Sequence, residues 1–376
     1  MRVRYFTNIP SPYRINFFNE LGKKCDLEVV FEAEKAPKIN NDWYKDNKIK
    51  NFKSIFLKKG IIEEQKINFK ILKYVTKKCD VLVFTNYSYY TEMLALIYAK
   101  ILRKKYVLMI DGGIISTNEM FLKRALKKFL ISNALSYFSP SKSTDDFLEY
   151  YGAEKDRINR YPFTSLYKDE IIKEPIASSE KIRLRNEMSI KESKVILSIG
   201  QFIQRKGFDW MIKAYKDLDK DIGIYIIGGE PTKEYINLKE KYHLTNLHFI
   251  EFQNKNTILK WYKLADLFVL PTREDIWGLV INEAMSQGLP IITTNKCVAG
   301  LELVKNGNNG FLVNVEDYDD LLNKTKYIFF NEENRYQMSL SSLEIIKKYS
   351  IENMSNLTFD FILSLSMINK VKKYEV

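Results

Sequence analysis

Two carboxylates and a glycine at the start of a predicted helix form the chemically most suggestive stretch of the chain. Asp275 lies in a short loop after the apolar run 267–270, and Glu283 follows it inside a helix expected to run from Gly278 to about Gly288. The first N–H groups of a helix lack partners within it, and this end carries about half a positive charge, which suits a phosphate. Gly278 has no Cβ to obstruct a ligand. Glu283 stands among apolar residues, where the hydroxyls of a ribose would satisfy its carboxylate. The alternative is a helix whose acids merely complement the dipole and face solvent.

Two cations follow an earlier predicted strand, 194–200. Arg205 and Lys206 precede Gly207 and a helix expected from residue 208. Cations are unfavourable at the positive end of a helix, and functional sites tolerate such local conflicts. A diphosphate would resolve the conflict, because Arg205 can bind it in a bidentate manner and Lys206 as a point charge. We expect these cations and the helix start framed by Asp275 and Glu283 to converge on a single pyrophosphate. Solvated surface cations are the alternative.

Strands of about five residues alternate with helices over most of the chain, which predicts α/β architecture with parallel sheets covered on both faces. A length of 376 residues suffices for two such domains. Expected strands of the first domain lie at 2–7, 27–31, 55–57, 81–85 and 106–110, with a further short strand before Ser139. Those of the second domain lie at 194–200, 222–227, 247–250, 267–270 and 290–293, with a further strand start at 310–312. The domains are predicted at 1–165 and 191–350, with a charged, irregular linker at 166–190 and a final helix at 351–376.

Polar residues also follow two strands of the first half, where doubly wound folds bind ligands. Ser11, Tyr13 and Arg14 lie between the first strand and the first helix, and Asp111 and Gly112 follow the fifth strand. They are candidates for substrate contacts. The first group also fits a helix start capped by proline, and the second fits a simple Asp-Gly turn.

Net charge distinguishes the two halves. Residues 1–170 contain 31 Lys and Arg against 20 Asp and Glu, whereas residues 171–376 contain 28 against 27. A basic half favours nucleic acid, anionic lipid or an anionic substrate. No nucleic-acid-binding module accompanies the charge, so we expect no nucleic acid partner. The helix 121–131 is basic and amphipathic, which predicts contact with an anionic membrane surface or, alternatively, a solvated helix over a core.

Composition excludes several other classes. No run of about 18 apolar residues exists to cross a membrane, and the first residues lack a signal-peptide core. Three scattered cysteines and two histidines exclude a disulfide framework and a histidine-based catalytic triad or metal site. We therefore expect a cytoplasmic protein without a bound metal.

The segment from Asp275 to Glu283 resembles the Glu-x7-Glu segment of retaining GT-B glycosyltransferases of family 4 (glycosyl transferases group 1), with Asp in place of the first Glu. Trp277 and Gly278 set this register. Lys206 matches the family's lysine, whereas Gln201 occupies its arginine position, so Arg205 is expected to supply that charge. Gly228 and Gly229 resemble the glycine turn that borders the nucleotide. The Pro-Ser-Pro-Tyr-Arg loop at 10–14 resembles the branch that builds bacterial surface polysaccharides.

The resemblance implies two Rossmann-like domains that face a cleft, with the last helix crossing back to the first domain. It further implies metal-independent transfer of a hexose or N-acetylhexosamine, with retention, from a nucleotide sugar (UDP-sugar) to a lipid-linked glycan. The enzyme would act in capsule, O-antigen or exopolysaccharide assembly at the inner face of the membrane. A catalytically degenerate subunit that binds membrane and a partner enzyme is the alternative.

The implied roles fall into three groups. Residues for the transfer chemistry are Arg205, Lys206, Asp275, Glu283 and Asp111. Residues for the nucleotide are Gly200, Gln201, Gly207, Gly228, Gly229, Trp277, Gly278, Leu279 and Glu283. Residues for the sugar and acceptor are Ser11, Tyr13, Arg14, Asp111, Gly112, Glu274 and Asp275.

Overall fold

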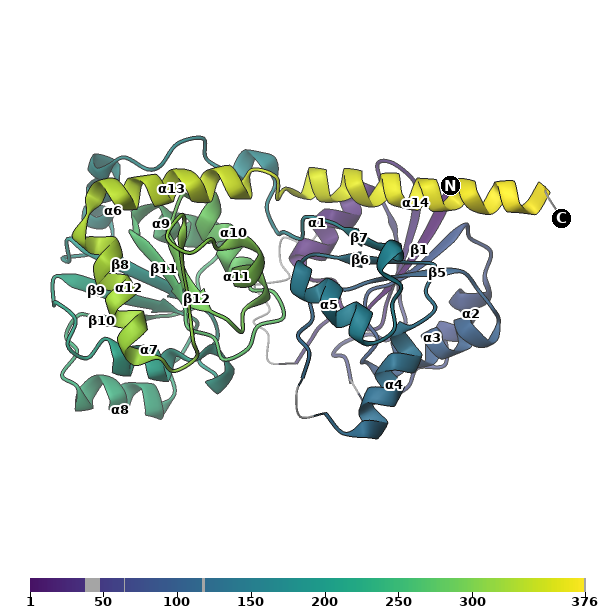
Figure 1. The fold of residues 1–376 in the computed structure, drawn as a ribbon, viewed down its shortest axis with the longest axis horizontal. Coiled ribbons are helices and arrows are strands. Elements are labelled where there is room, and N and C mark those ends of the chain that lie inside the picture. The colour runs from purple at the N-terminus through teal and green to yellow at the C-terminus, as the bar shows by residue number, and fades with distance from the viewer. Residues whose placement is uncertain (38–47, 64, 117–118, 375–376) are drawn as a thin grey trace. The chain divides into compact units, whose positions relative to one another are not determined.

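The computed structural model describes residues 1–37, 48–63, 65–116 and 119–374, and the chain divides into two compact units. Unit 1 comprises Met1–Ser165 and Tyr349–Val376, and unit 2 comprises Leu166–Lys348. In each unit a parallel sheet is covered by helices on both faces (Figure 1). The predicted α/β architecture is confirmed.

Unit 1 contains a seven-stranded parallel sheet in the order β3-β2-β1-β4-β5-β6-β7. The strands are β1 (Arg2–Thr7), β2 (Asp26–Phe31), β3 (Lys53–Phe56), β4 (Val81–Phe84), β5 (Tyr106–Met109), β6 (Ser136–Ser139) and β7 (Ile158–Arg160). The strand order reverses between β1 and β4, so their carboxyl ends form a switch point, where doubly wound folds bind ligands. The sequence analysis missed β7, a three-residue strand at the sheet edge.

The helices of unit 1 are α1 (Pro12–Leu21), α2 (Ile71–Thr76), α3 (Tyr90–Ile101), α4 (Phe121–Ile131), α5 (Lys142–Tyr150) and α14 (Ile351–Tyr374). Residues of α2, α3 and α5 form an apolar core with alternate residues of the strands. The final helix, α14, packs beside α1 (Figure 1). It places the ring of Phe361 against that of Phe138 of β6, at 5.8 Å between centroids. Its contacts therefore group α14 with unit 1.

Unit 2 contains a six-stranded parallel sheet in the order β10-β9-β8-β11-β12-β13. The strands are β8 (Lys194–Ile199), β9 (Ile222–Ile227), β10 (Leu247–Ile250), β11 (Leu267–Leu270), β12 (Ile291–Thr294) and β13 (Gly310–Val313). The order reverses between β8 and β11, which pair directly. The loops that follow these two strands, 200–207 and 271–278, therefore leave the sheet side by side.

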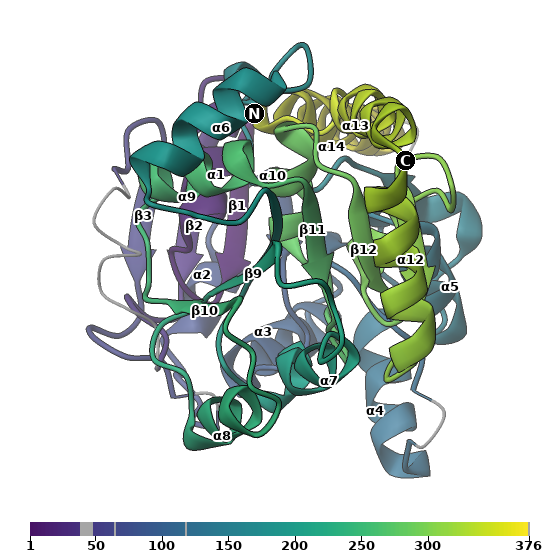
Figure 2. The same ribbon diagram turned by 90° about the vertical axis from the view of Figure 1, so that its left-hand side faces the viewer.

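The helices of unit 2 are α6 (Ser178–Glu187), α7 (Phe208–Ala214), α8 (Lys233–Lys241), α9 (Lys255–Leu264), α10 (Leu279–Ser286), α11 (Val298–Leu303), α12 (Tyr318–Phe330) and α13 (Glu332–Ile346). Helices α7, α8 and α12 cover one face of the sheet, and α6, α9, α10 and α13 cover the other (Figure 2). The core on the first face joins alternate strand residues to Phe208, Met211 and Leu321.

Helix α6 lies in the stretch for which the sequence suggested an irregular linker. Its Arg185 and Lys181 both contact Asp266, at 2.6 and 3.1 Å, and Asp266 directly precedes β11. Asp266 is almost fully buried, and although burial raises its pKa, the two neighbouring cations hold the pKa below its usual value. These ion pairs attach the helix to unit 2, to which residues 166–190 belong.

Candidate active site

The loops after β8 and β11 are joined by backbone contacts at the switch point of unit 2. The N–H of Arg273 donates to the carbonyl of Arg205 at 2.8 Å, and the hydroxyl of Thr272 donates to the same carbonyl at 2.9 Å. Gly207 adopts φ +73°, and a Cβ there would lie 2.0 Å from the carbonyl oxygen of Pro271. Only glycine lets the two loops approach this closely.

This approach brings together the cations and the first acid of the sequence motif. Lys206 and Arg205 belong to a short 3-10 turn, Gln204–Lys206, and both face Asp275. The Lys206 Nζ lies 2.6 Å from Asp275 Oδ2, and Arg205 Nη1 lies 3.6 Å from Oδ1. The side chains of Lys206 and Asp275 are only 14% and 12% exposed, whereas that of Arg205 is about half exposed. The expected convergence of cations and acid is therefore present, and it takes the form of a direct ion pair.

The neighbouring acid, Glu274, contributes its backbone to this arrangement. Its carbonyl accepts a hydrogen bond from Arg205 Nη1 at 2.8 Å and shares the Thr272 hydroxyl proton with the carbonyl of Arg205, each oxygen lying 2.9 Å from that hydroxyl. The Glu274 residue itself is exposed. Trp277 is buried, and its indole N–H donates to Asn282 at 2.8 Å. These contacts fix the loop that leads into the next helix.

Helix α10 begins at Leu279, one residue later than expected, and Gly278 is its N-cap with φ +99°. A residue with a side chain is strained in this conformation, and a Cβ there would approach the Cys297 sulfur to 3.0 Å. The first N–H groups of α10 emerge next to Asp275, which fits an anion at this helix end.

Glu283 lies in the second turn of α10, half buried, and accepts a hydrogen bond from Tyr262 of α9 at 3.0 Å. Tyr262 is fully buried, and burial followed by the negative charge of Glu283 raises the pKa of its phenol well above the usual value. The phenol therefore remains a donor at physiological pH and fixes one oxygen of the Glu283 carboxylate. Sequence patterns gave no signal for this partner, 21 residues away.

The glycines after β8 and β9 meet back to back. A Cβ on Gly228 would lie 1.8 Å from the carbonyl oxygen of Gly200, so this contact requires glycine. Gly229 has φ +99° with open space around it, and Gln201 is exposed beside Gly200. All four residues lie at the carboxyl edge of the sheet, the same edge as Lys206.

The candidates in unit 1 form a separate cluster around Asp111, which follows β5. Arg14 Nη2 lies 2.6 Å from Asp111 Oδ1, and Tyr13 donates to Oδ2 at 3.1 Å. Tyr161, which the sequence analysis missed, donates to the carbonyl of Ile110 at 3.0 Å and lies 3.4 Å from Asp111 Oδ1. Burial followed by the charge of Asp111 raises the pKa of Tyr161 well above its usual value.

The members of this cluster differ in their exposure to solvent. Ser11 and Arg14 are buried, whereas the Asp111 side chain is 24% exposed and Gly112 beside it is half buried. Asp111 is therefore the charged group of this cluster that a ligand of unit 1 can reach. Ser11 and Arg14 can act on a ligand only through their neighbours.

Helix α4 exposes its apolar side chains instead of packing them over a core. Phe121 and Leu122 are 81% and 75% exposed, Leu126 and Phe129 are also exposed, and only the end of the helix is buried. The alternative expectation, a solvated helix whose apolar face covers a core, is wrong for these four residues. An exposed apolar surface next to cations is typical of an interaction site.

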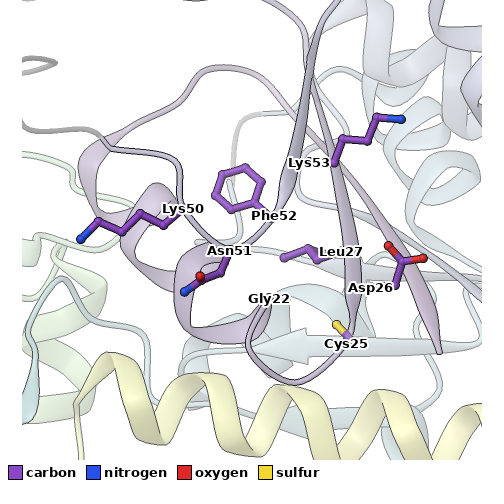
Figure 3. A pocket seen from close by; sticks show the side chains of 8 residues that line it. All are labelled: Gly22, Cys25, Asp26, Leu27, Lys50, Asn51, Phe52 and Lys53. Atoms are coloured by element: carbon purple, nitrogen blue, oxygen red, sulfur yellow. The ribbon is translucent and has the colours of Figure 1, made fainter.

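A surface hollow of about 500 Å³ lies elsewhere in unit 1 (Figure 3). Its lining includes Asp26 and Lys53, the first residues of β2 and β3, together with Cys25 and Asn51. It therefore opens at the amino ends of the strands, opposite the edge that bears Asp111. None of the candidate site residues contributes to it.

Known proteins resemble this chain in the sequence of unit 2 and in the overall fold. Residues 180–342, all in unit 2, match the family model of glycosyl transferases group 1. An uncharacterized glycosyltransferase of Haemophilus influenzae is 30% identical over 185 residues, which cover 48% of this chain and 52% of that protein. The lipopolysaccharide glucosyltransferase WaaG of Escherichia coli is 30% identical over 162 residues, 42% of each protein. The chain thus spans about half the length of these relatives.

The structural comparison extends over the whole chain. HepE of Anabaena, solved in complex with UDP, has a TM-score of 0.78 at 14% identity, covering 97% of this chain and 100% of HepE. The fold is GT-B. The GT-B fold accounts for the two Rossmann-like units and for the grouping of α14 with unit 1. The family match lies over the unit in which Lys206, Asp275 and Gly278 meet.

Proposed function

We propose that this chain is a glycosyltransferase that moves a sugar from a nucleoside diphosphate donor, preferably a UDP-sugar, to a hydroxyl of a glycan. The proposal depends on one observation above all, the pairing of Lys206 with Asp275 at 2.6 Å beside the helix end at Gly278. The family match over residues 180–342 supports it, as does the GT-B fold, which HepE shares in complex with UDP.

The proposed reaction requires stabilisation of the negative charge that develops on the leaving group. Cleavage of the bond between sugar C1 and the diphosphate oxygen leaves negative charge on the departing diphosphate. Arg205, Lys206 and the first N–H groups of α10 would stabilise that charge, as a divalent cation does in metal-dependent transferases. We therefore propose metal-independent transfer. Within the described ranges, no cluster of three His, Cys, Asp or Glu residues suits a metal ion.

Transfer with retention would proceed on one face of the sugar. The acceptor oxygen forms its bond to C1 on the face that the diphosphate leaves, and its proton passes to an oxygen of that diphosphate. Asp275 would hold hydroxyls of the transferred hexose or N-acetylhexosamine, and Glu283 would hold the ribose of the nucleotide. Trp277, Gly278 and Leu279 would border the diphosphate, and the turn at Gly228 and Gly229 would border the nucleoside.

For the acceptor we propose a lipid-linked glycan of surface-polysaccharide assembly, with Asp111 as its contact in unit 1. The similarity to WaaG, a lipopolysaccharide glucosyltransferase, supports this class. Helix α4 supports peripheral attachment to the anionic cytoplasmic face of a membrane, because it combines exposed Phe121 and Leu122 with Lys123 and Arg124. Across the described part of the chain, each helix is too short or too polar to span a bilayer.

The proposal is tested by screening the purified protein against UDP-, GDP-, ADP- and CMP-sugars by thermal shift, followed by turnover with the donor that stabilises it. We expect stabilisation by one UDP-sugar and slow donor hydrolysis without acceptor. The Glu283→Gln variant should remain folded and lose turnover. A protein that neither binds nor hydrolyses any of these donors would instead be a degenerate GT-B subunit that serves a partner enzyme.

A further inference from the structure

Arg273 connects the elements that carry the proposed donor site. It lies two residues before Asp275 in the loop after β11, and its side chain is about one quarter exposed. Its guanidinium forms a bidentate pair with Asp209 in the first turn of α7, with N–O distances of 2.7 and 2.8 Å. The same group donates to Glu316, after β13, at 2.8 Å.

Arg273 also binds the turn that presents the two cations. Its Nη1 donates to the carbonyl of Gln204 at 2.6 Å, and its backbone N–H donates to the carbonyl of Arg205 at 2.8 Å. A single side chain therefore joins the loop of Asp275 to the turn of Lys206 and to the helix behind that turn.

Two carboxylates, those of Asp209 and Glu316, form ion pairs with Arg273. Burial raises the pKa of Asp209, but the hydrogen bond and charge of Arg273 outweigh burial, so the net pKa lies below its usual value. Glu316 adopts φ +63°, a backbone conformation that is unfavourable for a residue other than glycine. Its carboxylate reaches Arg273 from this conformation. Arginine is required, because a lysine lacks the planar fork that binds a carboxylate and a carbonyl together.

We propose that Arg273 is a positioning residue for the donor site, which fixes Lys206 and Asp275 in the geometry that binds the diphosphate and the sugar. It acts through the loops and touches no substrate. This inference depends on the proposed function, since it assigns a role in donor binding.

The test compares Arg273→Lys, Arg273→Gln and Asp209→Asn with the wild-type protein, with UDP affinity measured by titration calorimetry well below the melting temperature. We expect each variant to bind UDP about tenfold more weakly, which corresponds to the loss of one charge-assisted hydrogen bond. Combining Asp209→Asn with Arg273→Gln should add little, because both changes break the same contact.

Arg183→Gln is the matched control. Arg183 also pairs with two carboxylates, Glu180 and Glu187, but on the exposed face of helix α6, away from both loops. Its loss should leave UDP affinity unchanged. If Arg273→Lys lowers the melting temperature but leaves UDP affinity at the wild-type value, Arg273 is merely structural and the proposal fails.

Hydrogen exchange provides a readout that needs no nucleotide. Arg273→Gln should accelerate exchange of backbone amides in both 204–207 and 271–277, whereas Arg183→Gln should not. Unchanged exchange in either loop overturns the positioning role. A wild-type protein that binds no nucleotide while Arg273→Gln still loosens both loops would refute the proposed function and leave the loop contact intact.

Discussion

Replacing Asp275 with Asn should separate binding of the nucleotide from transfer of the sugar. In the absence of ligand, the Asp275 carboxylate engages both Lys206 and Arg205, the two cations proposed to bind the diphosphate. The acid therefore competes with the ligand for the same cations. Asn keeps the shape of the side chain and removes the competing charge.

The size of the effect follows from the geometry. Asp275 Oδ2 lies 2.6 Å from Lys206 Nζ, and a phosphate oxygen on the other side of that nitrogen would lie about 5 to 6 Å from the carboxylate. At an effective dielectric constant of about 20, repulsion between two unit charges at that distance is about 3 kcal/mol. Solvent and salt reduce this value, so we expect a gain of about 1 to 2 kcal/mol. Free UDP should then bind roughly five to thirty times more tightly.

Transfer should respond in the opposite direction. Asp275 is proposed to hold the sugar hydroxyls, so its replacement should lower turnover about a hundredfold or more. Calorimetric titration with UDP and a donor turnover assay measure the two quantities at one ionic strength. Asp217→Asn, which removes an exposed carboxylate just after α7, is the control and should change neither. Weaker UDP binding in Asp275→Asn, with turnover near normal, would refute the assigned roles.

Three further outcomes are expected. Gly207→Ala should destabilise unit 2 by about 2 kcal/mol or more in urea unfolding, because its Cβ would lie 2.0 Å from a carbonyl oxygen. Gly229→Ala, with open space around it, should destabilise it by about 1 kcal/mol. Equal destabilisation by the two variants would contradict the loop contact. Burial, followed by the charge of Glu32, raises the pKa of the fully buried Glu92 well above its usual value. The free energy of unfolding should therefore fall as the pH rises above about 4.5, the pKa of Glu92 in the unfolded chain, by about 1.4 kcal/mol per pH unit until the folded pKa is reached. Glu92→Gln should flatten that dependence and stabilise the protein at pH 8 but not at pH 4, and an unchanged pH profile would refute this. A variant with Phe121→Ser and Leu122→Ser should cosediment less with vesicles of anionic lipid than the wild type, and equal sedimentation would argue against α4 as the membrane contact.

Strand and helix periodicity sufficed to predict both parallel sheets and most of their strands. It failed where tertiary contacts decide the structure. Helix α6 has little apolar patterning, and its ion pairs with Asp266 keep it in unit 2, so the sequence suggested only a charged linker. The short edge strand β7 likewise gains its structure from pairing with β6.

Some features of the candidate site could also be predicted from the sequence, whereas others could not. Residue types predicted that Lys206 and Asp275 approach each other, because loops after neighbouring strands of a parallel sheet share one edge. Their direct pairing could not be predicted, nor could the contacts of Arg273 with Asp209 or of Tyr262 with Glu283, since each depends on side-chain orientations that the strand and helix pattern does not determine. The exposed apolar surface of α4 was visible as a pattern, but whether it covered a core or faced outward depended on packing.

The affinity of UDP for the Lys206→Gln variant tests the central claim most directly. Calorimetry should give binding about ten to a hundred times weaker than wild type, which is the loss of one charge-assisted hydrogen bond to the diphosphate. Lys216→Gln, which removes an exposed lysine just after α7, should bind UDP like the wild type. If the wild type binds UDP and Lys206→Gln binds it equally well, the diphosphate does not lie between Lys206 and the start of α10.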